Sequence, residues 1–223
     1  NLAGIGIADR NTLAGVVRAH VALKETDAAE GGLKLAIGCR LVFADGTPDL
    51  LAYPKDRAAY GRLSRLLSLG KRRAEKGECH LTLDDLLAES EGLLLILIPP
   101  EKIGDETIEA LKKLTAHVPD HLWLGAIPLH HGRDKIRLHH LAELATYYQI
   151  PLIALNDALY HHSDRRRVQD VFTCIREHQT IETIGKKLEA HAERHLKSAA
   201  DMAHLFHDHP EALEETTRFF ARL

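Results

Sequence analysis

Three apolar runs, each ending at polar residues, constrain the fold of this 223-residue chain more than any other feature. The runs lie at Ile5–Leu13, Ile37–Asp45 and Ile153–Tyr160. In α/β proteins, functional side chains sit where a strand gives way to a loop at its carboxyl end. Two of the polar residues here are arginines, Arg10 and Arg40, which are cations without a lone pair for a metal ion. The pattern therefore predicts the frame of an α/β enzyme that has lost its catalytic groups.

Composition favours an ordinary globular domain without a strong charge bias. Hydrophobic residues make up 45% and charged residues 27% of the chain, and the net charge is −3. The longest apolar run, Leu93–Pro100, is too short to cross a bilayer, so we expect no membrane partner. The chain opens on Asn1 without a basic leader, and its three cysteines are widely spaced. We therefore expect reduced thiols and a cytoplasmic location.

Strand-like and helix-like segments alternate along the chain, which predicts a mainly parallel sheet with helices outside it. We expect strands at 4–8, 33–43, 50–53, 93–98, 122–127 and 152–155. We expect helices from Asn11 or Thr12 to Gly31-Gly32, over 56–69, 105–117, 134–148 and 163–177, and from Thr82, Ser198 and His209-Pro210. Residues 71–78 form a charged connection, and the chain is almost wholly helical from about Ser163 onward. Length alone does not separate a barrel from an open sheet.

Four stretches carry a resemblance to a known family. They are Ala8–His20 (ADRNTLAGVVRAH), Gly38–Asp45 (GCRLVFAD), Tyr53–Lys76 and Asn156–Arg176 (NDALYHHSDRRRVQDVFTCIR). Through them the whole chain resembles the PHP (polymerase and histidinol phosphatase) domain of a bacterial C-family DNA polymerase, similar to the polymerase III alpha subunit. Within that family it resembles the error-prone branch. The resemblance implies an α/β fold, a distorted (β/α)7 barrel that here lacks its first β/α unit and carries extra C-terminal helices.

The resemblance also implies how the chain is divided. Residues 1–223 would form a single PHP-like domain, with the barrel at about 1–160. The helical part at about 163–223 would lead toward the polymerase palm. Family members begin with a strand that ends in a His-x-His pair, and no segment of this chain matches that unit.

Three positions that hold metal ligands in the family are changed here. Arg10 stands where the family has His, Arg40 where it has Glu, and Leu159 where it has His, whereas Asp157 is retained. Two guanidinium groups in one pocket would repel divalent ions. We expect them to pair with Asp9 and Asp157, leaving a vestigial pocket without metal. An alternative is that the arginines bind phosphate, which a guanidinium matches bidentately.

Histidines and basic runs offer two further sets of candidates. His130 and His131 follow an expected strand, so they are the best candidates for a residual role in the pocket. Most of the sixteen histidines fit exposed loops better than a chelate, because neighbouring residues on a helix or strand point apart. Two basic runs are candidate phosphate or DNA contacts, although solvated surfaces carry such runs too. They are Lys71, Arg72 and Arg73, and Arg165, Arg166 and Arg167.

The resemblance implies a parent protein that is a DNA-directed DNA polymerase, a nucleotidyltransferase acting in error-prone translesion synthesis and DNA repair. Its magnesium-binding carboxylates would lie in a downstream palm. We assign no catalytic residue, metal ligand or cofactor here, and expect a structural module. The downstream polymerase domains would be its partners in cis, and DNA, the sliding clamp and accessory mutagenesis proteins would be partners of the parent. The alternatives are an active PHP phosphoesterase or 3′–5′ exonuclease, and a stand-alone binding protein.

Overall fold

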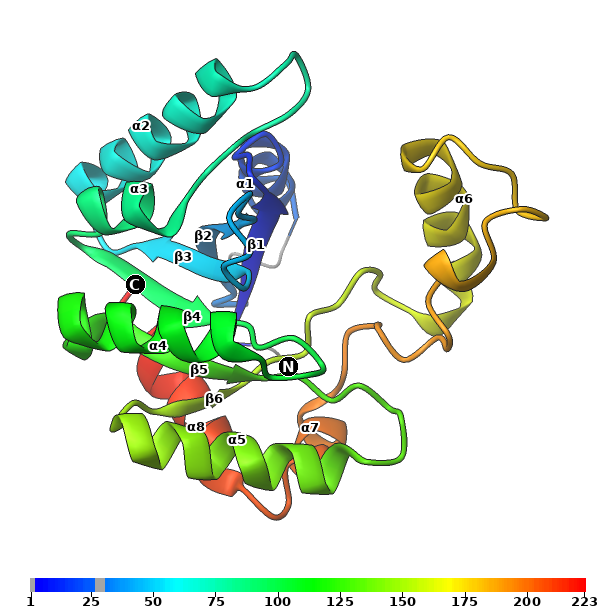
Figure 1. Ribbon diagram of the computed structural model, residues 1–223. Coiled ribbons are helices and arrows are strands. Elements are labelled where there is room, and N and C mark those ends of the chain that lie inside the picture. Colours follow the sequence, from blue (N-terminus) through cyan, green and yellow to red (C-terminus); the bar gives the residue numbers. More distant parts are fainter. Residues whose placement is uncertain (1–2, 27–30) are drawn as a thin grey trace.

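The computed structural model describes residues 3–26 and 31–223 and has a mixed α/β fold. Six strands form one sheet, and their order in the sheet is their order in the sequence (Figure 1). The strands are β1 (Gly4–Arg10), β2 (Lys34–Leu41), β3 (Leu50–Pro54), β4 (Leu93–Leu97), β5 (Leu122–Ala126) and β6 (Leu152–Ala154).

Strand pairing is mainly parallel, as the alternation of strands and helices predicted. β1 pairs with β2, β4 with β5 and β5 with β6 in parallel, whereas β3 runs antiparallel to both of its neighbours. The reversal follows from the short connection between β2 and β3, which turns at Asp45-Gly46 and is too short for a crossover helix. The start of β3 therefore lies beside the carboxyl ends of the other strands.

Eight helices and three short 3-10 turns accompany the sheet within the described residues. The helices are α1 (Val16–Lys24), α2 (Arg57–Arg73), α3 (Leu83–Ala88), α4 (Asp105–His117), α5 (Asp134–Tyr148), α6 (Arg166–Arg176), α7 (Ala199–Leu205) and α8 (Pro210–Phe220). The 3-10 turns are η1 (Pro119–His121), η2 (Ser163–Arg165) and η3 (Gly185–Lys187).

Alternation along β4 divides the core into two layers. Leu93, Leu95 and Leu97 point to one face of the sheet, where they pack in a cluster with buried residues of α2, α3, α4 and α5. Leu94 and Ile96 point to the opposite face and belong to a second, smaller cluster. All five side chains are essentially inaccessible to solvent. Because successive side chains of a strand point to opposite faces, an apolar run without alternation is what a strand buried on both faces requires.

Helix α8 covers the second face of the sheet near its C-terminal end (Figure 1). The ring of Phe219 meets Trp123 at 4.8 Å and Tyr53 at 5.5 Å between centroids, both edge to face. The Trp123 indole Nε1 donates a hydrogen bond of 2.8 Å to Glu215 in the same helix. The C-terminal helix is therefore an integral part of the sheet packing.

Most expected elements are confirmed to within one residue. Helices α4 and α5 have the expected bounds, and β3, β4, β5 and β6 each end one residue away from the expected position. Thr82 and Ser198 form complete capping boxes at the starts of α3 and α7, and Pro210 is the first residue of α8. These elements carry their start signals in the local sequence, which is why they could be predicted.

The N-terminal prediction was wrong in two respects. Strand β1 continues two residues past Ala8, because parallel pairing with β2 extends to Arg10 opposite Arg40. The next helix begins at Val16 after Gly15, so neither Asn11 nor Thr12 is its cap, and it ends at Lys24 instead of at Gly31-Gly32. Asn11 instead bonds across to Val42, its amide accepting from and donating to that backbone. Residues 27–30 of the expected helix lie outside the described part of the chain.

Two other segments differ from their predictions. Helix α2 begins after Asp56, whose carboxylate caps the helix by accepting a hydrogen bond from the Ala59 N–H. The helix continues four residues past Leu69 into the expected charged connection. The cations in its last turn interact favourably with the negative end of the helix dipole, which stabilises these additional residues as helix. The C-terminal part is less helical than expected, since residues 177–198 contain only the short turn η3.

Beyond β6, an isolated parallel bridge joins Tyr160 and His195. The Leu159 N–H donates to the carbonyl of Arg194 at 2.8 Å, and the Leu196 N–H donates to the carbonyl of Tyr160 at 3.1 Å. The chain beyond β6 is therefore held against a much later segment. Within the described residues, no helix combines the length and apolar character that crossing a membrane requires.

Two leucines on α2 provide a test of the packing. Leu66 is fully buried, whereas Leu69 is 38% exposed on the same helix. We predict that Leu66→Ala lowers the free energy of unfolding by about 2–5 kcal/mol, because it leaves a cavity in the larger cluster. The matched Leu69→Ala change should cost less than about 1 kcal/mol. Urea unfolding measures both, and similar losses would contradict this packing.

Candidate functional site

The carboxyl ends of the parallel strands bring the predicted site residues to one edge of the sheet. Asp9 and Arg10 end β1, Arg40 is the penultimate residue of β2, and Asp157 follows β6 by three residues. Asp49 joins them from the residue before β3, because that strand runs in the opposite direction. The site therefore draws on four strands, of which one contributes through its start.

Arg40 lies at the centre of an ion-pair cluster. Its Nε donates to Asp49 at 2.7 Å, and its Nη1 donates to both oxygens of Asp157 at 3.1 and 3.2 Å. Only 18% of the Arg40 side chain is exposed. Burial acts against the charged guanidinium, but the two carboxylates outweigh it and hold the pKa of Arg40 above its ordinary value. The expected pair between an arginine and Asp157 is therefore present.

Arg194 is a second guanidinium in the cluster, and sequence reasoning missed it. Its Nε and Nη2 both donate to the backbone carbonyl of Asp157 at 3.1 Å, and Nη2 also contacts the Asp157 carboxylate. Its Nη1 donates to Glu189 at 2.8 Å. Arg194 lies 37 residues after Asp157 in an irregular segment, so no local pattern in the sequence links the two residues.

Three residues at the carboxyl ends of strands adopt left-handed backbone conformations. Asn11 follows β1 with φ 49°, His130 follows β5 with φ 55°, and Asp157 follows β6 with φ 48°. Asn, Asp and His tolerate this region better than other residues that carry a Cβ. Such conformations gather at functional sites, where the surrounding structure holds them. At Asp157 the turn is fixed from both sides by Arg40 and Arg194.

Asp9 and Arg10 are placed differently from the prediction. The Asp9 carboxylate accepts a hydrogen bond of 2.8 Å from the Gly15 backbone N–H and has no arginine partner among the described residues. The Arg10 side chain is 60% exposed, and its Nη1 lies 4.0 Å from Asp49. The two side chains diverge because neighbours on a strand point to opposite faces. Pairing of an arginine with Asp9 was therefore a wrong prediction.

Leu159 and Cys39 lie beside the cluster without taking part in it. Leu159 is 38% exposed and contributes only its backbone N–H, which bonds to Arg194. The Cys39 thiol is fully buried next to the end of β1, where its Sγ lies 3.3 Å from the Asp9 carbonyl. Burial raises the pKa of Cys39 to about 11. All three cysteines of the chain are free thiols.

His130 and His131 gather around a third histidine that the sequence did not single out. The His191 ring lies 5.3 Å from the His130 ring and 6.1 Å from the His131 ring, and its Nε2 is 2.9 Å from the Leu129 carbonyl. Burial lowers the pKa of His130, which favours the neutral imidazole. Among residues 3–26 and 31–223, no three His, Cys, Asp or Glu side chains are arranged to hold a metal ion.

A cleft of about 530 Å³ opens beside the ion-pair cluster. Its wall includes Arg40, Asp49, Asp157, Arg194, His131 and Arg137. Arg137 donates to the Pro99 carbonyl at 3.0 Å, and its Nε is buried without a hydrogen-bond partner. Burial lowers the pKa of Arg137, and Asp134 and Glu101 offset only part of the effect. Arg40 and Arg194 are matched by carboxylates, and the wall has no uniform basic charge.

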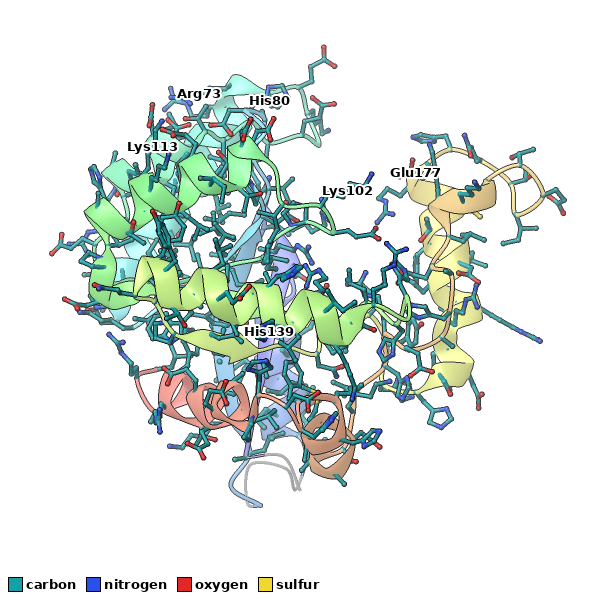
Figure 2. All side chains as sticks on the ribbon, turned by 60° about the horizontal axis from the view of Figure 1, so that its bottom comes forward. Arg73, His80, Lys102, Lys113, His139 and Glu177 are labelled. Atoms are coloured by element: carbon teal, nitrogen blue, oxygen red, sulfur yellow. The ribbon has the colours of Figure 1, made fainter. Side chains whose placement is uncertain are left out.

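The two basic runs lie on separate parts of the molecule. Lys71, Arg72 and Arg73 are in the last turn of α2, and Arg165–Arg167 begin α6. Figure 1 shows α2 beside the sheet and α6 standing away from it, and Figure 2 shows Arg73 far from Glu177, which follows α6. The runs therefore do not form one continuous track for nucleic acid.

Some of the basic side chains are already paired within the fold. Arg73 donates to Asp85 at 2.6 Å, and Arg166 lies 3.7 Å from Asp170. Asp164, the acidic residue next to the second run, contacts His162 at 3.3 Å. These pairs leave fewer free cations for phosphate than the sequence alone suggests.

Comparison with known proteins identifies relatives of this chain. It is 57% identical over 221 residues to the error-prone DNA polymerase of Rhodopseudomonas palustris strain BisB5, and 53% identical over 224 residues to that of Bradyrhizobium diazoefficiens. These matches include 99% and 98% of this chain but only 20% and 19% of the relatives. The chain therefore spans about a fifth of the length of the curated relatives that it matches.

A solved structure and the family models complete the comparison. A crystal structure from Bifidobacterium adolescentis, of a protein assigned as a metal-dependent phosphoesterase, matches with a TM-score of 0.47 at 15% identity. The match covers 70% of this chain and 77% of that one. No family model matches the chain. The chain is therefore homologous to one segment of the error-prone DNA polymerases, which confirms the resemblance to that branch found in the sequence.

The central carboxylate of the cluster can be tested by a charge-removing substitution. We predict that Asp157→Asn lowers the free energy of unfolding by about 2–3 kcal/mol, because two partly buried guanidinium groups then lose their shared counter-charge. Asp164→Asn is the control, since the Asp164 side chain is 87% exposed and should cost less than about 0.5 kcal/mol. Equal losses in urea unfolding would show that the cluster does not stabilise the fold.

A second prediction concerns pH and the pair between Arg73 and Asp85. Burial of Asp85 acts against ionisation, but hydrogen bonds from Arg73 and Thr82 outweigh it and hold the pKa of Asp85 below its ordinary value. A carboxyl group with a lowered folded pKa stabilises the protein above its unfolded pKa, about 3.9. That stabilisation is lost as the pH falls through the folded value.

We therefore expect Asp85→Asn to lower the free energy of unfolding by about 1 kcal/mol at neutral pH. The loss should become progressively smaller as the pH falls below about 4. The adjacent Asp84 provides the control, because its side chain is 83% exposed and its nearest cation, Lys113, is as far away as 3.9 Å. Across this pH range, the free energy of unfolding of Asp84→Asn should stay close to that of the unsubstituted protein. A pH-independent loss for Asp85→Asn would contradict the assignment.

Proposed function

We propose that this chain is the PHP domain of an error-prone DNA-directed DNA polymerase, and that the domain itself is a structural module without catalysis. The observation that carries the proposal is the position of Arg40 and Arg194 around Asp157. The guanidinium groups lie against the carboxylate that the family resemblance would assign to a metal ion. The interactions that a metal would make with Asp157 are made instead by fixed cations of the chain.

The chemistry of the cluster supports a role without metal. Metal-assisted hydrolysis needs a cation that holds and activates water, together with open coordination positions. A guanidinium has no lone pair and does not bind water as a Lewis acid, although it balances negative charge equally well. Arg40 and Arg194 therefore replace the electrostatic role of metal ions and not their catalytic role.

The proposed parent protein supplies the polymerase chemistry elsewhere. DNA-directed nucleotidyl transfer uses magnesium ions held by carboxylates, and we assign these to a downstream palm domain outside this chain. The downstream polymerase domains are the proposed partners in cis. DNA, the sliding clamp and accessory mutagenesis proteins are proposed partners of the parent during translesion synthesis and repair in the cytoplasm.

The proposed architecture is a distorted (β/α)7 PHP barrel. The parallel pairing of β1 with β2, of β4 with β5 and of β5 with β6 supports it. We propose that residues 1–160 form the barrel part and residues 163–223 the part that leads to the palm. Both parts belong to one domain in this proposal, since α8 packs on the second face of the sheet.

The proposal is tested on the complete protein that contains this chain. We expect it to extend a primer past a damaged template base, to lack 3′–5′ hydrolysis of the primer, and to hold less than about a tenth of an equivalent of zinc, manganese or iron. Primer extension, gel analysis of the primer end and elemental mass spectrometry measure the three properties.

Each outcome separates the proposal from its alternatives. Hydrolysis that requires a bound metal ion and is lost in His131→Ala would identify an active PHP-type phosphoesterase or exonuclease instead. A protein without primer extension would exclude the polymerase parent and favour a stand-alone binding protein. The Arg10→Ala variant serves as a control, because that side chain is exposed and should change neither activity nor metal content.

A further inference from the structure

Helix α6 exposes a continuous apolar stripe. Val168, Val171, Phe172 and Ile175 recur at the spacing of one helix face, with exposed fractions of 47%, 56%, 61% and 64%. Ile181, just beyond the helix, is 52% exposed and lines an open groove with Val171 and Ile175. Single exposed apolar residues are common, but a contiguous stripe on a polar helix marks an interaction surface.

The opposite side of α6 is buried, so the orientation of the stripe is fixed. Thr173 and Cys174 are 6% and 9% exposed, and Ile184 in the returning segment is 3% exposed. The Gln179 N–H donates to the Cys174 carbonyl at 3.0 Å, which closes the end of the helix. The helix thus buries one face within its own segment and presents the apolar stripe outward.

We call residues 161–193, which contain η2, α6 and η3, the α6 arm. Figure 1 shows α6 standing away from the sheet and from the helices that cover it. The base of the arm is fastened by the ion-pair cluster, since Arg194 holds both Asp157 and Glu189. Arg166 also donates to the Glu189 carbonyl at 2.6 Å. These contacts therefore hold the base of the α6 arm, and with it the stripe, in a fixed position.

Charge at the start of α6 gives the surface a second property. Neither Arg165 nor Arg167 has a carboxylate within 4.0 Å in the described part of the chain. Both lie at the N-terminal end of the helix, where the dipole is also positive. The first turn would therefore favour carboxylates on a partner. The surface combines an apolar centre with a basic end.

We propose that the α6 stripe docks against the part of the polymerase chain that lies outside these 223 residues. The inference rests on the proposed function, because it requires this chain to be one domain of a larger polymerase. The matched relatives carry about four-fifths of their length beyond the region that this chain spans. The docking surface on that remainder would present apolar side chains to Val171, Phe172 and Ile175, and carboxylates to Arg165 and Arg167.

The size of the stripe favours this occupant over a second copy of the chain. An 11-residue helix is about 16 Å long, so one face of it covers far less than the ~800 Å² that each partner gives to a stable interface. Two free molecules would also lose translational and rotational freedom on association. A surface on the same chain avoids most of this loss, because the linkage gives a high effective concentration.

Side-chain footprinting of the complete polymerase tests the docking. Hydroxyl-radical modification of Phe172 is compared with that of Tyr147, which is 79% exposed on α5, each normalised to its intrinsic reactivity. We expect Phe172 to react at least about tenfold more slowly than Tyr147, because a docked stripe is closed to solvent most of the time. In Ile175→Glu the two rates should become similar, since a buried charge without a partner disfavours docking.

Ile136→Glu is the matched control, because Ile136 is 61% exposed on a helix, close to the 64% of Ile175. It should leave the slow modification of Phe172 unchanged. Equal rates for Phe172 and Tyr147 in an unsubstituted protein that extends primers would overturn the docking while leaving the proposed function intact. Protection that disappears on dilution would also overturn it, because it would identify a second copy as the occupant. Absence of primer extension would instead refute the proposed function.

Discussion

The bonds from Arg40 and Arg194 to Asp157 hold together three segments of this molecule that are distant in the sequence. Asp157 sits in a left-handed turn after β6, Arg40 is in β2, and Arg194 lies beyond the α6 arm. Removing the Asp157 carboxylate would leave Arg40 with Asp49 and Arg194 with Glu189, without the charge that joins the two guanidinium groups. The geometry of the strand ends and the position of the arm therefore depend on one carboxylate.

The cluster also shows how carboxylates that gather at strand ends are neutralised by side chains of the same chain. A site that gathers carboxylates at strand ends needs positive charge, because unpaired anions in a cleft repel each other. Asp49, Asp157 and Glu189 receive that charge from the two arginines. Fixed side chains supply this positive charge at every ion concentration.

Sequence patterns predicted the elements whose signals are local. Thr82, Ser198 and Pro210 begin helices because their side chains or rings favour that position, and the apolar run of β4 matches a strand buried on both faces. The pair between Arg40 and Asp157 followed from their positions at strand ends. Asp49, Glu189, His191 and Arg194 were missed, because the first precedes a reversed strand and the others lie in irregular chain. Their roles depend on tertiary contacts, which produce no periodic pattern in the sequence.

The buried thiol of Cys39 bears on the chemical durability of the strand ends. With a pKa of about 11, only about one molecule in ten thousand carries the thiolate at pH 7, and that form is the one that oxidants and alkylating agents attack. Complete burial adds a steric barrier to the same reactions. The ends of β1 and β2 therefore keep an unmodified thiol in the presence of agents that react with exposed thiolates.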